Sequence, residues 1–135
     1  RTLWGLAALP NEARGPAVDR AIQQGLAFLL APGRLPEADY PVPDGGRVHS
    51  FWSRLNFPLF YQADVLFVLR VAGDLGALDR PGAQAALAWL AGRRLKNGRW
   101  RGSSPFRGRT WPQLGGPEET RRWVTLQAAA LLAGR

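Results

Sequence analysis

The chain has 135 residues, 46% of them hydrophobic and 21% charged. This composition supports one globular domain with a core and excludes a disordered polar chain. Cysteine is absent, which excludes disulfide bonds and thiolate metal sites. The net charge is +8, but Lys96 is the only lysine among 18 basic residues. Such an excess of arginine is typical of a GC-rich coding bias, so the charge alone is weak evidence for a polyanionic partner.

The first third of the chain predicts two helices. A short helix over 2–9 ends at Pro10, because proline cannot continue a helix. A second helix begins with Pro16 in its first turn, where the missing N–H has no cost, and ends at the segment APGR. Its apolar residues recur every three or four positions, as on one face of a helix: Val18, Ile22, Leu26 and Leu29.

The stretch 35–58 holds four prolines and a Gly-Gly pair, and it predicts a long irregular connection. The apolar run over 59–72 then predicts a third helix, with Gly73 and Gly76 at its end.

The remaining third predicts two further helices. Asp79 is expected to cap the fourth helix, with Pro81 close to its start. The fifth helix begins at Pro117, and two glutamates follow in its first turn, where the helix dipole favours acid. The apolar stripes expected on these helices are, for the fourth, Ala83, Ala86, Leu87 and Leu90, and, for the fifth, Trp123, Leu126 and Ala130.

No useful stretch of strand-like alternation occurs, so the fold class is all-α. The pattern of predicted helices also repeats along the sequence. The segment GLAFLL at 25–30 aligns with ALAWLA at 86–91, and the helix starts keep the same offset. Two helix–link–helix units followed by the opening of a third predict a helical-repeat array.

The segments WLAGRRLKNGRW and EETRRWVTLQAAALL resemble the squalene-cyclase and prenyltransferase type of repeat. The resemblance of the chain to this type of repeat is good over roughly 50–133 and loose over 1–49. Gly98-Arg99-Trp100 matches the Gly-x-Trp turn of that family, while Leu95 stands where a glutamine is usual. The resemblance implies helical-hairpin repeats forming part of an α/α toroid. In this interpretation residues 1–135 are a single domain, the C-terminal part of a longer squalene-cyclase-like protein, and Gly98 and Trp100 form a structural repeat turn.

The catalytic sites of that family are not found in the sequence. The acidic residues are scattered and form no Asp-rich acid motif, and a zinc site cannot be built with no cysteine and only His49. A Gly-x-Ser-x-Gly nucleophile motif is also missing. We therefore expect no catalytic residue, metal or cofactor in this chain, and no enzyme activity from the chain by itself. If the full protein is an enzyme, the resemblance implies an activity like that of a terpenoid cyclase or a prenyltransferase.

Aromatic residues before and inside the predicted third helix suggest an aromatic-lined pocket for an isoprenoid or another apolar ligand. The candidate ligand-binding residues are His49, Trp52, Phe57, Tyr61 and Asp64. Each has a structural alternative. The aromatic rings can be core, His49 can bond a loop backbone, and Asp64 can interact with the first turn of a helix.

The basic stretch 93–111 has two interpretations as well. Its candidate anion-binding residues are Arg99, Arg101, Arg107 and Arg109, which would serve a nucleic-acid or anionic-surface binding module. Alternatively the stretch is a repeat connector in which a buried Trp100 contacts the fourth helix and a neighbour.

The partners expected are the missing N-terminal part of the same protein or a second copy, because an unfinished array exposes an edge. An apolar small molecule is a further candidate ligand, whereas nucleic acid is not favoured. No apolar run reaches the roughly 18 to 20 residues of a membrane span. The compartment is not encoded in any motif; the cytoplasm is the expectation.

Overall fold

A computed structural model of the chain describes residues 1–105 and 116–134. These residues form five α-helices and one short 3-10 helix, with no strand and a single isolated bridge between Asn56 and Ser103. The all-α class is therefore confirmed for the described part. The helices are α1 (Thr2–Ala7), η1 (Asn11–Ala13), α2 (Pro16–Leu29), α3 (Val65–Asp74), α4 (Pro81–Gly92) and α5 (Pro117–Leu132).

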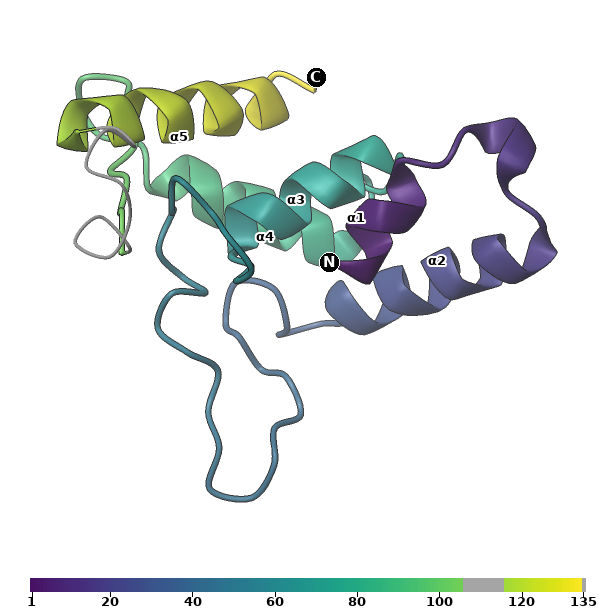
Figure 1. The fold of residues 1–135 in the computed structure, drawn as a ribbon. Helices are drawn as coiled ribbons and strands as arrows, with labels where there is room; N and C mark the ends of the chain where they lie inside the picture. Colours follow the sequence, from purple (N-terminus) through teal and green to yellow (C-terminus); the bar gives the residue numbers. More distant parts are fainter. Residues whose placement is uncertain (106–115, 135) are drawn as a thin grey trace.

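The helices pack as two consecutive pairs, α1 with α2 and α3 with α4, and α5 lies against the second pair (Figure 1). Helix α3 is central, since it contacts α1, α4 and α5. Seven of its ten residues are buried. The long connection between α2 and α3 extends away from the helices in Figure 1. No helix in the described residues has the length and apolarity needed to cross a membrane.

Two predicted helix starts were wrong. Helix α3 begins at Val65 and not at Leu59, because the Asp64 side chain accepts the N–H of Phe67 and caps the helix at that point. Residues 59–63 are irregular despite their apolar composition.

Helix α4 is preceded by Arg80 and not capped by Asp79, because Pro81 takes its first position. Helix α1 also ends at Ala7, two residues earlier than predicted.

The core is continuous through all five α-helices. Its most deeply buried side chains come mainly from α3 and α4 and include Leu66, Leu69, Leu90, Trp100 and Val124. A close backbone contact joins the two helix pairs, since a Cβ atom added at Gly82 would lie 2.0 Å from the Leu30 carbonyl oxygen. Only glycine permits this approach between the end of α2 and the start of α4.

The apolar stripe predicted for α5 is not the face that packs on the core. The buried positions of this helix are Thr120, Val124, Ala128 and Leu131. Trp123 and Leu126 are 43% and 59% exposed. Helix α5 thus has one largely apolar face that is buried and another that is exposed. Residues recur every three or four positions on both faces, so a helical spacing does not tell them apart.

Candidate anion-binding site

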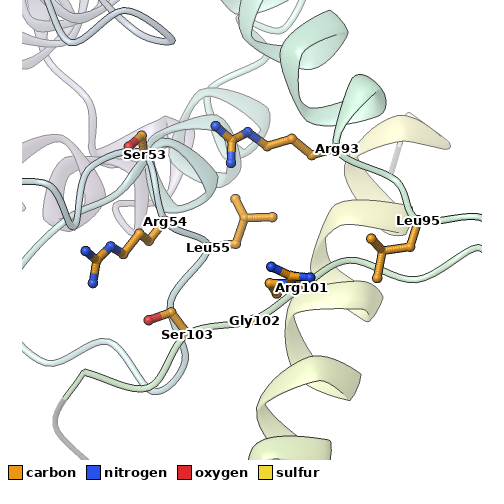
Figure 2. Close-up of a pocket in the computed structure, with 8 residues that line it drawn as sticks. All are labelled: Ser53, Arg54, Leu55, Arg93, Leu95, Arg101, Gly102 and Ser103. Carbon is orange, nitrogen blue, oxygen red and sulfur yellow. The ribbon is translucent and has the colours of Figure 1, made fainter.

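A pocket of about 540 Å³ lies between the loop that precedes α3 and the segment that follows α4. Three arginines line it: Arg54, Arg93 and Arg101. Figure 2 shows them arranged around Leu55, with Arg93 at the end of α4 and the other two on the loop segments. Ser53 and Ser103 add hydroxyl groups to the lining. The remaining wall is apolar or backbone, formed by Leu55, Leu95 and Gly102.

Backbone hydrogen bonds join the two loop segments directly under the pocket. The Ser103 N–H donates to the Leu55 carbonyl at 2.7 Å, and the Phe57 N–H donates to the Ser103 carbonyl at 2.9 Å. These two bonds frame the bridge between Asn56 and Ser103. Backbone pairing therefore holds residues that are far apart in sequence side by side. This pairing fixes the backbone positions of Arg54 and Arg101 relative to each other.

The first of these segments is attached to α3 through Asp64, whose side chain is fully buried. One carboxylate oxygen accepts the Asn56 backbone N–H at 2.8 Å and the Asn56 side-chain amide at 3.0 Å. The other accepts the Phe67 N–H at 2.8 Å. Burial raises the pKa of Asp64, and the hydrogen bonds from Phe67 and Asn56 oppose that rise. Asp64 is thus a structural junction between the loop and the helix.

The second segment is held by Trp100, which is 2% exposed. Its indole N–H donates to the Leu90 carbonyl of α4 at 2.7 Å, and its backbone N–H donates to the Thr125 hydroxyl of α5 at 3.1 Å. Gly98 has φ +80°, a conformation that favours glycine. The expected burial of Trp100 and its contacts with the fourth helix and a neighbour are confirmed.

Gly102 sets the depth of the pocket wall. A Cβ atom at this position would lie 2.8 Å from the Thr120 methyl group and 3.0 Å from the Thr120 carbonyl oxygen. The segment 101–103 therefore lies close to α5 at Gly102, and a side chain at this position would displace the segment or Thr120.

The arginines of the pocket have no acidic partner in the described part of the chain. The ion pairs there all involve Glu118, which lies 2.6 Å from Arg99, 3.0 Å from Arg121 and 3.8 Å from Arg122. Arg93 is instead stacked on the Trp89 ring, 4.1 Å from its centroid. The pocket consequently concentrates positive charge that no described carboxylate neutralises.

The anion-binding residues proposed from the sequence are only partly brought together. Arg101 lines the pocket, but Arg99 pairs with Glu118 and does not. Arg107 and Arg109 lie outside the described residues. Sequence reasoning missed Arg54 and Arg93 as site residues. Arg93 at least begins the basic stretch, whereas no local signal connects Arg54 with that stretch.

The five proposed ligand-binding residues do not surround one cavity. His49 and Trp52 border a shallow hollow of about 190 Å³, and Trp52 also lines an apolar cavity of about 80 Å³ against α1 and α3. Phe57 stacks on Trp123 with ring centroids 5.3 Å apart, and Tyr61 is 76% exposed. The His49 ring accepts the Phe51 N–H at 3.2 Å, which is the backbone bond given as its structural alternative.

Comparisons with protein-family models, curated proteins and solved structures found no match to this chain. No group of three or more side chains suited to hold a metal ion gathers within residues 1–105 and 116–134. Guanidinium groups stay protonated throughout the physiological range, and hydroxyl groups donate hydrogen bonds. Such a lining can hold an anion, but it supplies no group that exchanges protons near neutral pH.

Proposed function

We propose that this protein is a helical-repeat binding module that holds a small phosphate-bearing ligand in the pocket of Arg54, Arg93 and Arg101. The observation that carries the proposal is that three arginines, none of them ion-paired within the described residues, line one concave site. Guanidinium forks match phosphate oxygens in pairs, and charge-assisted bonds of this kind are the strong ones. The volume of about 540 Å³ lies within the roughly 300–1,000 Å³ of small-molecule sites.

The geometry favours this function over an apolar-ligand site. The cavity beside Trp52 has a volume of about 80 Å³, which is below the roughly 300 Å³ at which small-molecule sites begin. It also favours a small ligand over a nucleic-acid strand. Of the two basic residues singled out in the stretch 93–111 that the structure describes, Arg99 is engaged by Glu118 and Arg101 faces the pocket, so these two do not form one track for a strand.

We further propose, from the sequence resemblance, that the array is part of a squalene-cyclase-like α/α toroid. The packing of Trp100 on α4, at the position of the family's repeat turn, supports this proposal. Further helices, from the rest of a longer protein or from a second copy, would then pack against α5.

Calorimetric titration with inorganic pyrophosphate tests the binding proposal. We expect the triple variant Arg54→Gln, Arg93→Gln, Arg101→Gln to lose at least about a hundredfold in affinity, because each hydrogen bond to a charged group contributes about 1.5–3 kcal/mol. A matched triple variant, Arg20→Gln, Arg47→Gln, Lys96→Gln, removes the same charge outside the pocket and should bind nearly as well as the wild type.

Two results would contradict the proposal. One is the absence of pyrophosphate binding by the wild type. The other is an equal loss of affinity in both triple variants, because binding would then depend on net charge and not on the pocket.

A further inference from the structure

Helix α5 presents an apolar face that no described helix covers. Trp123 and Leu126 lie on this face and are exposed, and Ala130 continues it one turn further on. Helix α3 is different, because its neighbours on several sides bury most of its residues. Exposed large side chains that share one helix face are typical of an interaction surface.

The face is hollowed into a groove between α3 and α5. One part of the groove, of about 320 Å³, is bordered on the α3 side by Arg70, Gly73 and Asp74. It adjoins a second part, of about 460 Å³, bordered by Glu119 and Arg122 near the start of α5. Trp123 and Leu126 line both parts. The groove therefore has an apolar floor on α5, with Glu119 and Arg122 near the start of that helix and with Arg70 and Asp74 on the α3 side.

Contacts between α3 and α5 show at which level of α5 the charged residues of α3 lie. Arg70 donates to Gln127 at 3.2 Å, and a Cβ atom at Gly73 would lie 3.7 Å from the Leu131 side chain. Helices α3 and α5 thus run in the same direction here. Asp74, the next residue, lies at the level of Leu131, whereas Arg122 lies more than two helical turns nearer the start of α5.

We propose that a second copy of this chain occupies the groove, with the two α5 helices antiparallel about a two-fold axis near Leu126. In that arrangement Trp123 of each copy stands opposite Ala130 of the other, so that a large side chain meets a small one. Arg122 stands opposite the level of Leu131, where Asp74 offers the opposite charge. A two-fold axis forms each of these contacts twice. The pairing of Trp123 with Ala130 and of Arg122 with Asp74 makes these parts of the groove complementary to themselves, and this feature favours a second copy over an unrelated partner.

Sedimentation equilibrium of the full chain over a range of concentrations tests this inference. We expect a reversible monomer–dimer equilibrium. Leu126→Asp should raise the dimer dissociation constant at least about tenfold, because it buries an unpaired charge at the centre of the contact. Val42→Asp, at an exposed aliphatic position on the loop between α2 and α3, is the control and should leave the constant unchanged.

A charge-exchange series identifies the occupant. Arg122→Glu and Asp74→Arg should each weaken the dimer, and the double variant should recover most of the loss, because the exchanged charges meet again across the axis. Thermal melting of every variant checks that the fold is retained. A monomer at all concentrations up to about 1 mM, which corresponds to a binding free energy of only about 4 kcal/mol, would overturn the inference. So would a dimer insensitive to Leu126→Asp, or a double variant as weak as the single ones.

Discussion

Asp64 shows how a single residue connects the binding pocket to the helical core. The sequence offered two roles for it, contact with a ligand or interaction with the first turn of a helix. The structure gives it the second role and adds a bond to Asn56 that holds the pocket segment. The pocket itself is not lined by Asp64. Its effect on binding would therefore be indirect, through the position of the Arg54 segment.

Asp64→Asn should lower the free energy of unfolding by about 1–3 kcal/mol, since one oxygen is lost and a buried donor of Asn56 is left unpaired. The loss should also depend on pH. The pKa of Asp64 is raised in the folded protein above its ordinary value of 3.8, so the folded state binds the proton more tightly than the unfolded state. The stability from this effect is present below the unfolded pKa and is lost as pH rises through the folded pKa.

The difference in unfolding free energy between the wild type and Asp64→Asn should accordingly become smaller as pH rises across this window. Urea denaturation of both proteins at several pH values measures it, and the other carboxyl groups cancel in the comparison. A difference that grows with pH would show that the three hydrogen bonds outweigh burial and hold the pKa of Asp64 below its ordinary value.

At the scale of elements, the sequence predicted helices better than loops. Helix α2 and the start of α5 were predicted correctly because proline fixes the first turn of each helix, and because the apolar residues of α2 keep a helical period. The start of α3 was misplaced because the apolar residues over 59–63 belong to a partly exposed loop, and apolar composition alone does not separate such a loop from a helix. The exposed stripe of α5 was mistaken for its core face for a similar reason, since composition does not reveal which of two apolar faces is covered.

Trp100 connects two elements, and its replacement tests the connector role. Trp100→Ala should lower the free energy of unfolding by about 3–5 kcal/mol, the usual cost of removing a large buried aromatic side chain. Trp100→Phe should cost less, because the ring is largely kept while the bond to the Leu90 carbonyl is lost. Trp4→Ala, at a tryptophan that is 50% exposed, serves as the control and should cost less than Trp100→Ala. Urea denaturation gives all three values, and a Trp100→Ala change within error would refute the connector role.

At the scale of the whole molecule, the pocket could not be derived from the sequence because it depends on long-range pairing. Arg54 and Arg101 become neighbours only through the backbone hydrogen bonds between Leu55, Phe57 and Ser103. No local sequence pattern predicts those bonds. The aromatic residues grouped by sequence were separated for the same reason. Trp52 donates its indole N–H to the Leu35 carbonyl, whereas Phe57 stacks on Trp123.

The central claim is that one ligand bridges the two segments that form the pocket, and amide chemical shifts measured during a pyrophosphate titration test it most directly. We expect the amides of Ser53, Gly102 and Ser103 to shift together along one saturating curve, with the dissociation constant found by calorimetry. Amides of the exposed loop over 41–47 should not move. Shifts that never saturate, or that are confined to regions away from both pocket segments, would contradict the claim.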